Sequence, residues 1–229
     1  MPNAVFITAT DTDAGKTWVT QYLIRALLKQ RENAKAIKPI ACGLDDHGEN
    51  AKAENTDVRI LRDAQGLSQA SDINYCSFNK AAAPSIAAQA EGKSINPEHL
   101  KSWCREQVSS VDVCLIEAIG GLMTPITANY LVSDWLRGIP DMPVILVVGA
   151  KLGCINHALL SLSQLASIGR DPAWVVINNR DGTQDTHAIK EALLPHLSST
   201  SSILECGYNQ PENLSPLVVC LQGLLHNNI

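Results

Sequence analysis

Short runs of β-branched and aliphatic residues alternate with longer segments of helical periodicity along this 229-residue chain, and this alternation most strongly constrains its fold. The runs that we expect to form strands are residues 4–9, 34–38, 111–116, 144–148, 174–177 and 203–204. Apolar residues recur at helical spacing between them, for example over 19–27, 129–137 and 155–166. This order predicts a three-layer α/β fold with a doubly wound, mostly parallel sheet and helices on both faces.

The composition is consistent with a single domain of this class. Only 4% of the residues are aromatic, so the core must consist mainly of Ala, Val, Ile and Leu, as is typical of buried parallel strands and their covering helices. The chain contains no repeat and no low-complexity linker, and its length suits one large domain. We therefore expect residues 1–229 to form one domain.

Charge and hydropathy exclude several classes of partner. With 18 basic and 23 acidic residues the net charge is −5, so no broad positive surface is expected to bind nucleic acid or anionic membrane. The longest apolar run, 144–150, is far shorter than the roughly 20 residues of a membrane-spanning helix. The seven cysteines are scattered, without the spacing of a zinc site or a disulfide framework. These features predict a cytoplasmic protein with reduced thiols.

The segment from Thr10 to Thr17 lies between the first expected strand and the first expected helix. Gly15 allows the backbone amides to turn inward, Lys16 can meet the charge of β- and γ-phosphates, and the hydroxyl of Thr17 can bind Mg²⁺. Thr10 occupies the place of the first glycine in the usual phosphate-binding loop. The alternative is a capped helix start with an exposed lysine, but the strand and helix on either side favour a nucleotide site.

Three further charged residues follow expected strands or loops at the same edge of the sheet, namely Lys38, Asp57 and Glu117. Singly, they could be a strand-end charge, a helix cap and a solvated loop residue, respectively. Together with the Thr17 hydroxyl, the two carboxylates would make an oxygen-rich site suited to Mg²⁺.

Several segments of the chain resemble the dethiobiotin synthetase family. The family's phosphate loop corresponds to Ala9–Thr17, and its Lys-Pro-Val-x-Ser/Thr-Gly stretch corresponds to Lys38–Gly43. The most specific likeness is the Lys-Leu-Gly-Cys-Ile-Asn-His segment at 151–157. Further matches are Asn55–Asp57, Glu117–Gly121, Thr124-Pro125, Asp134-Trp135 and Pro143–Gly149. The resemblance covers about residues 4–180 and weakens afterwards.

The resemblance implies an ATP- and Mg²⁺-dependent ligase of biotin biosynthesis. Its substrates would be 7,8-diaminononanoate and CO₂ or bicarbonate, and its product dethiobiotin, formed through a carbamate and a carbamic-phosphoric anhydride. It also implies a homodimer whose substrate site lies across the subunit interface.

The resemblance also implies a role for particular residues. The catalytic residues would be Lys38, Lys16 and Thr12. The nucleotide would be bound by Asp13, Ala14, Gly15, Lys16, Thr17 and Asn178, the last at adenine. Magnesium would be bound by Thr17, Asp57 and Glu117. The substrate would be bound by Cys42 and by the loop Gly153, Cys154, Ile155 and Asn156, whose backbone amides would face the substrate carboxylate of the neighbouring subunit.

The sequence departs from the family pattern at Ala9, Ala14, Cys42, Ala118-Ile119 and Gly207. Alanine at 118 stands where the family has glycine, and it would be strained if φ were positive there. Cys154 and His157 could be packing residues, and Asn178 a turn residue. The departures leave an alternative function open, a nucleotide-binding paralogue that acts as a regulatory or partner-binding ATPase without dethiobiotin synthesis.

Overall fold

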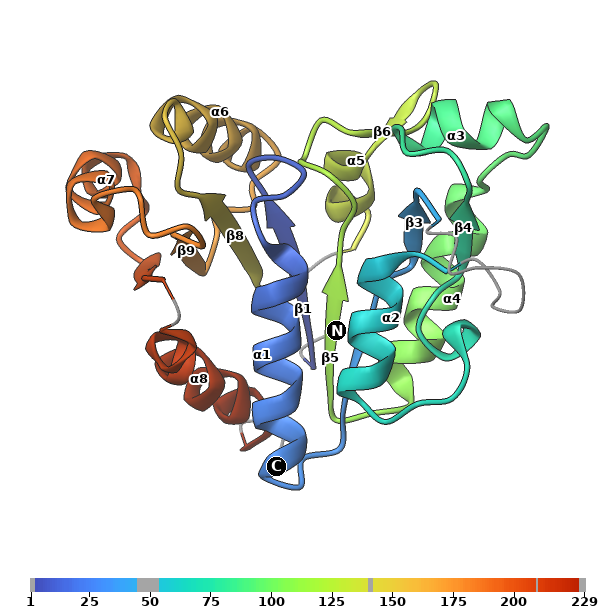
Figure 1. Ribbon diagram of the computed structural model, residues 1–229, viewed down its shortest axis with the longest axis horizontal. Coiled ribbons are helices and arrows are strands. Elements are labelled where there is room, and N and C mark those ends of the chain that lie inside the picture. Colours follow the sequence, from blue (N-terminus) through green and yellow to red (C-terminus); the bar gives the residue numbers. More distant parts are fainter. Residues whose placement is uncertain (1–2, 45–53, 140–141, 209, 227–229) are drawn as a thin grey trace.

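A computed structural model describes residues 3–44, 54–139, 142–208 and 210–226. Its central sheet has six parallel strands in the order β10-β9-β8-β1-β5-β2 (Figure 1). These strands are β1 (Ala4–Ala9), β2 (Ala34–Ile37), β5 (Val113–Glu117), β8 (Val144–Gly149), β9 (Trp174–Asn178) and β10 (Ser202–Cys206). Two small two-stranded sheets pair β3 (Ile40–Cys42) with β4 (Cys76–Phe78), and β6 (Pro125–Thr127) with β7 (Tyr130–Leu131).

Helices cover both faces of the central sheet (Figure 1). The α-helices are α1 (Lys16–Lys29), α2 (Thr56–Ala64), α3 (Pro84–Ala90), α4 (Pro97–Ser109), α5 (Val132–Arg137), α6 (Cys154–Ser167), α7 (Thr186–Leu193) and α8 (Ser215–His226). Short 3₁₀ turns occupy Ala70–Asp72, Leu194–His196 and Pro211–Leu214. Helices α1 and α8 lie against one face, while α4, α5, α6 and α7 cover the other.

Strand β1 is apolar at every position except Thr8, and its burial explains this. Successive side chains in a strand point to opposite faces, and both faces here are covered by helices. Phe6 packs into the cluster beneath α4 to α7, where its ring meets Trp135 edge-on with centroids 5.1 Å apart. Val5 and Ile7 pack against α1 on the opposite face. The sheet is therefore buried on both sides.

Parallel pairing brings the carboxyl ends of β1, β5, β2 and β8 to one edge of the sheet. Ile7 is paired with Glu117, and Ala9 with Val147, so the loops after β1, β5 and β8 start side by side. Ligands of open α/β sheets bind at this edge. The fold thus collects the loops that carry the motifs.

All six central strands occur where the sequence predicts them, within about two residues, and the parallel sheet with helices on both faces is confirmed. One prediction is wrong in detail. The helix expected over 129–137 begins at Val132, because Tyr130 and Leu131 pair with β6 instead. The polar loop expected over 44–56 lies largely outside the described residues.

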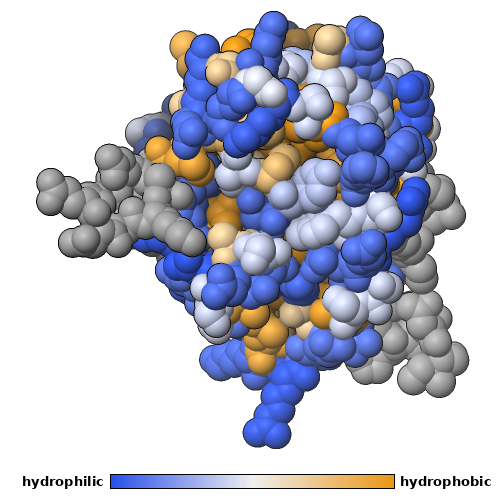
Figure 2. Space-filling view, turned by 90° about the vertical axis from the view of Figure 1, so that its right-hand side faces the viewer, coloured by the Kyte–Doolittle hydropathy of each residue, from blue (hydrophilic) through white to orange (hydrophobic). Residues whose placement is uncertain are grey.

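The face that carries α3 and α4 is shown in Figure 2, where hydrophobic side chains form small patches between hydrophilic ones. Within the described ranges, no helix is both long and apolar enough to cross a membrane.

Candidate active site

The phosphate loop joins β1 to α1 and is held in a conformation that only glycine readily adopts at its last turn. Gly15 caps α1 with φ of +95°, and a Cβ there would collide with the amide of Asn178. Asn178 is buried at the end of β9 and donates from Nδ2 to the carbonyl oxygen of Ala14 at 2.9 Å. Gly149, the last residue of β8, allows the loop to approach closely, because a Cβ there would lie 2.8 Å from the Cα of Ala14. Two other strand ends therefore shape the loop.

Lys16 begins α1 and is almost fully buried, with 6% of its surface exposed. Its Nζ donates to the carbonyl oxygen of Asp11 at 3.2 Å. Burial, and next the nearby charge of Lys38, lower the pKa of Lys16 to about 8. This lysine is poised for an anion: a bound phosphate would compensate the cost of its burial.

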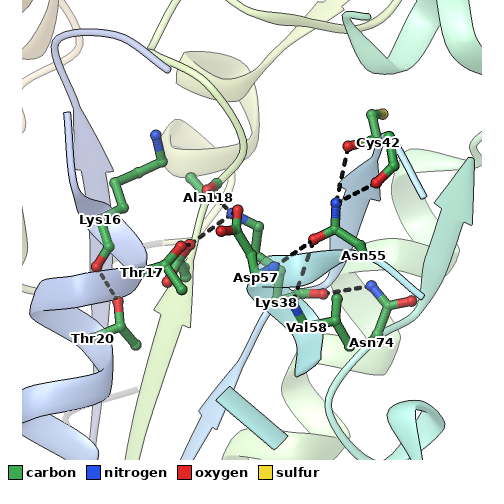
Figure 3. Close-up of polar contacts among 12 residues, drawn as sticks. Lys16, Thr17, Thr20, Lys38, Cys42, Asn55, Asp57, Val58, Asn74 and Ala118 are labelled. Atoms are coloured by element: carbon green, nitrogen blue, oxygen red, sulfur yellow. Dashed lines mark hydrogen bonds and ion pairs between the residues drawn. The ribbon is translucent and has the colours of Figure 1, made fainter. Parts of the chain in front are cut away.

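Lys38 is buried and lies at the centre of a polar cluster (Figure 3). Its Nζ is 2.6 Å from Glu117 Oε1 and 3.2 Å from Asp57 Oδ2, and it donates to the carbonyl oxygen of Ala118 at 3.3 Å. Thr17 Oγ1 donates to the same Glu117 Oε1 at 2.6 Å. The structure thus brings together the three predicted metal ligands and Lys38, one of the two lysines predicted to be catalytic.

Each member of the cluster is positioned by its own element. Glu117 is the last residue of β5, and Ala118 continues the ladder by donating to the carbonyl oxygen of Ile7 at 2.9 Å. Lys38 directly follows β2, and its backbone bonds to Ile73 and Asn74 at 2.8 and 2.7 Å. These contacts fix both side chains at the carboxyl edge of the sheet.

Asp57 is positioned by a helix cap. Asn55 accepts hydrogen bonds from the amides of Asp57 and Val58, so the first turn of α2 is fixed. The Asn55 amide also donates to the carbonyl oxygens of Cys42 and Gly43 at 3.0 and 2.7 Å (Figure 3). One buried asparagine thereby ties the start of α2 to the end of β3.

The charges of the cluster stabilise the ionised forms of Lys38 and Asp57. Burial lowers the pKa of Lys38, but the charges of Glu117 and Asp57 outweigh it and raise that pKa overall. Burial raises the pKa of Asp57, but the charge of Lys38 and its hydrogen bond bring it below the usual value. Lys38 is therefore a cation and Asp57 an anion at neutral pH.

The donor set fits a magnesium ion. Glu117 Oε1 accepts two hydrogen bonds, whereas the buried Oε2 has no hydrogen-bond partner among the described residues. Two carboxylates and a hydroxyl are hard oxygen donors of the kind that bind Mg²⁺, which commonly keeps water and phosphate oxygens as further ligands. The described ranges contain no cluster of three or more His, Cys, Asp or Glu side chains that could hold a metal ion.

A cavity of about 1010 Å³ opens beside this cluster. Its walls are the phosphate loop, the start of α1, the ends of β2 and β3, the start of α2, residues 81–84 and 119–125, one side of α6 and Arg180. This volume is at the upper end of the range for small-molecule sites. It has room for a nucleotide's phosphates together with a second substrate.

The predicted site residues fall into three groups. Those that line the cavity are Thr12, Asp13, Gly15, Lys16, Thr17, Lys38, Cys42 and Asp57. Those buried behind its wall are Ala14, Glu117 and Asn178. The third group, Gly153, Cys154, Ile155 and Asn156, is not part of the lining, although the next residue, His157, is.

The loop before α6 has a conformation suited to offering amides outward. Gly153 caps α6 with φ of +87°, and the amides of Ile155 and Asn156 precede the first intrahelical hydrogen bond, from His157 to Gly153. The amide of Cys154 instead donates to Lys151 at 2.9 Å, and its side chain packs in the core. The packing alternative for Cys154 is thus confirmed for its side chain.

The backbone at Ala118 does not have the strained conformation that the sequence left possible. Ala118 does not have positive φ; among the described non-glycine residues, only Asp13 and Arg31 do. Alanine is therefore unstrained at this position. The conformation that requires glycine lies two residues later, at Gly120, with φ of +59°.

Sequence reasoning missed two features of the site. Asp11 in the phosphate loop pairs with Lys151, which follows β8, at 2.8 Å. Arg180, two residues after β9, reaches the cavity wall. Asp11, Lys151 and Arg180 each follow a strand of the central sheet within two residues, and this position in the sequence was the available signal. To predict that they share one site, however, the order of the strands in the sheet is needed.

A Gly-Lys-Thr loop between a buried strand and a helix, at the carboxyl edge of a parallel sheet, defines a P-loop nucleotide-binding protein. A family described as an AAA domain matches residues 3–205. The ATP-dependent dethiobiotin synthetase BioD of Pseudoalteromonas translucida (strain TAC 125) is 37% identical over 184 residues, covering 80% of each chain. BioD of Yersinia pestis bv. Antiqua (strain Angola) is 37% identical over 175 residues, 76% of this chain and 71% of the relative. The chain belongs to the family of ATP-dependent dethiobiotin synthetases, which are ligases of biotin biosynthesis.

The fold also has a counterpart among solved structures. The hydrogenase maturation factor HypB from Archaeoglobus fulgidus aligns with a TM-score of 0.59 over 97% of this chain and 89% of its own. At 13% identity, this likeness concerns the fold alone.

Proposed function

We propose that this protein forms dethiobiotin from 7,8-diaminononanoate, CO₂ or bicarbonate, and ATP. The observation that carries the proposal is the convergence of Lys16, Thr17, Lys38 and Asp57 on one cavity, with Glu117 directly behind them. These are the groups that phosphoryl transfer to a carboxylate-like acceptor requires. Family membership supports the same reaction.

The proposed reaction has three steps. One amine of the substrate attacks CO₂ and loses a proton, giving a carbamate. A carbamate oxygen then attacks the γ-phosphorus of ATP, the bond to ADP breaks, and a carbamic-phosphoric anhydride forms. The second amine attacks its carbonyl carbon, phosphate leaves with the bonding electrons, and loss of a proton completes the ureido ring.

Lys38 would bridge the carbamate and the γ-phosphate in the second step. Its three N–H groups are directed at Glu117, Asp57 and the carbonyl oxygen of Ala118. The contact with Asp57 is the longer of the two ion pairs, and the Asp57 side chain is 42% exposed. Release of this contact would turn one N–H toward the cavity while Glu117 still holds the ammonium group.

The phosphate loop would bind the triphosphate. Backbone amides of Asp13, Ala14, Gly15, Lys16 and Thr17 would surround it, and the Thr12 hydroxyl would lie near the transferred group. Lys16 would move from the carbonyl oxygen of Asp11 to the phosphate oxygens. Asn178 supports the loop from beneath, and we retain it as the proposed contact to adenine.

Thr17, Asp57 and Glu117 would hold Mg²⁺. The ion would supply positive charge to the phosphate oxygens during transfer. Glu117 Oε2 supports that role, because it is buried and has no hydrogen-bond partner in the part of the chain that the structure describes.

The substrate would lie between Cys42 and the loop 153–156 of a second subunit. Apolar side chains are exposed where α6 begins: Leu152 is 96% and Ile155 36% exposed. An exposed apolar group of this kind beside a substrate loop supports a homodimer. Replacement of Leu152 by Asp should then give a monomer in sedimentation experiments and lower the affinity for diaminononanoate.

We further propose one domain over residues 1–229, working in the cytoplasm and without nucleic-acid or membrane partners. Helix α8 supports the single domain, because Leu217 and Leu221 pack in the same core cluster as Leu23 and Leu27 of α1. All seven cysteines are free thiols, as in a reducing compartment.

The test is direct synthesis. Purified protein is incubated with diaminononanoate, bicarbonate, Mg²⁺ and ATP, and dethiobiotin and ADP are quantified by mass spectrometry. We expect the two products in equal amounts and no dethiobiotin when any component is omitted. ATP hydrolysis without dethiobiotin would instead favour the paralogue acting as a regulatory ATPase.

A further inference from the structure

Asp11 connects the phosphate loop to a distant turn. One carboxylate oxygen accepts from the amide of Thr12 at 2.8 Å, and the other accepts from Nζ of Lys151 at 2.8 Å. The carbonyl oxygen of the same residue accepts from Nζ of Lys16 at 3.2 Å. Asp11 therefore contacts two lysines, one through its backbone and one through its side chain.

A carboxylate is an unexpected group in a loop that must accept a triphosphate. Its negative charge would repel the phosphates at short range, where water screens least. The hydrogen bond and charge of Lys151 lower the pKa of Asp11, so the carboxylate is ionised and needs a counter-charge. Lys151 provides that charge from the other side of the loop, 140 residues away in the sequence.

Fold stability does not account for this pair. The side chains of Lys151 and Asp11 are 52% and 47% exposed, and ion pairs with such exposure contribute only about 0–1 kcal/mol. Lys151 also closes the turn before α6, because its carbonyl oxygen accepts from the amide of Cys154. It thus links the phosphate loop to the loop 153–156.

We propose that Lys151 is a positioning residue of the nucleotide site, which neutralises Asp11 so that the phosphate loop accepts the phosphates of ATP. The inference rests on the nucleotide site of the proposed function and adds a residue to it. Lys151 acts through Asp11 and not by contact with the reacting atoms. The same tie holds the nucleotide loop and the proposed substrate loop in one relative position.

A double-mutant cycle separates this charge effect from a structural one. The affinity for Mg·ADP is measured by titration calorimetry for the wild type, Lys151→Met, Asp11→Asn and the double variant. Lys151→Met leaves Asp11 unpaired and should weaken binding about tenfold, whereas the double variant should recover to within about threefold of the wild type. Lys151→Arg should bind like the wild type. In turnover, Lys151→Met should raise KM for ATP more than it lowers kcat.

Lys101→Met is the matched control, because Lys101 forms a similar 2.6 Å pair with Glu98 on α4, away from the cavity. It should bind Mg·ADP like the wild type. Unchanged binding in Lys151→Met would overturn the inference and leave the nucleotide site intact. The inference would also be overturned if the double variant bound Mg·ADP as weakly as Lys151→Met, since removal of the Asp11 charge would then not restore the affinity. Absence of binding in the wild type would overturn the nucleotide site and this inference together.

Discussion

Lys38 and Glu117 form a buried ion pair, with Nζ and Oε1 2.6 Å apart and side chains 3% and 0% exposed. They come from neighbouring strands, since Lys38 follows β2 and Glu117 ends β5. Each charge offsets the desolvation free energy of the other, because a buried charge without a partner strongly destabilises a fold. The pair keeps the Lys38 ammonium group next to the Glu117 carboxylate, whose Oε2 has no hydrogen-bond partner among the described residues.

Replacement of Lys38 by Met should abolish dethiobiotin synthesis and also destabilise the fold. It leaves Glu117 buried without its counter-ion, which costs about 3–5 kcal/mol in comparable pairs. Urea unfolding should show this loss, and the double variant Lys38→Met/Glu117→Gln should regain most of the stability but no activity. Near-native turnover in Lys38→Met would show that phosphoryl transfer occurs elsewhere.

Thr17→Val should lower activity about 10–100-fold, the range typical of groups that hold a metal site together. It removes the hydroxyl that donates to Glu117 and that we assign to Mg²⁺. Rate measurements over a series of Mg²⁺ concentrations should show a higher requirement for the ion. Thr20→Val is the control, because the buried Thr20 hydroxyl donates to the carbonyl oxygen of Lys16 one turn earlier and does not line the cavity. An equal loss in both variants would indicate a general effect on α1.

Ala118→Gly should change activity little and cost about 0.5–1 kcal/mol of stability through added chain entropy. The reason is that Ala118 has no positive φ to relieve. Gly120→Ala should be more harmful: φ is +59°, and the new Cβ would collide with Thr124 Oγ1, which accepts from the amide of Gly121. Both are checked by urea unfolding and initial rates. A large gain of activity in Ala118→Gly would contradict the observed geometry.

Cys42 should be a slow nucleophile despite lining the cavity. Burial raises the pKa of its thiol to about 11 from the ordinary 9.0, so at pH 8 its thiolate fraction is about 100-fold lower than that of an ordinary cysteine. Alkylation by iodoacetamide, followed peptide by peptide, should accelerate about tenfold per pH unit up to pH 11. Rapid labelling at pH 7 would refute this. Cys42→Ser should retain activity, because the two side chains are nearly isosteric.

The contiguous parts of the site were predictable from the sequence. Gly15, Lys16 and Thr17 are neighbours, so the strand before them and the helix after them suffice to define the phosphate loop. The four inner strands β1, β5, β8 and β9 were equally accessible, because burial on both faces leaves nearly continuous aliphatic runs. The short strands β6 and β7 were not, since Tyr130 and Leu131 form a hairpin only through pairing with a segment that lacks a strand pattern.

The sequence by itself determined the α/β class, the phosphate loop and the candidate residues, because these depend on local spacing and on the alternation of buried segments. Only the tertiary structure decided which residues meet. Strand order places Lys38 beside Glu117 and Lys151 beside Asp11, across 79 and 140 residues, and no local preference encodes such pairings. It also decided that alanine at 118 is unstrained, since a backbone angle there is set by the ladder with β1 and not by the residue type alone.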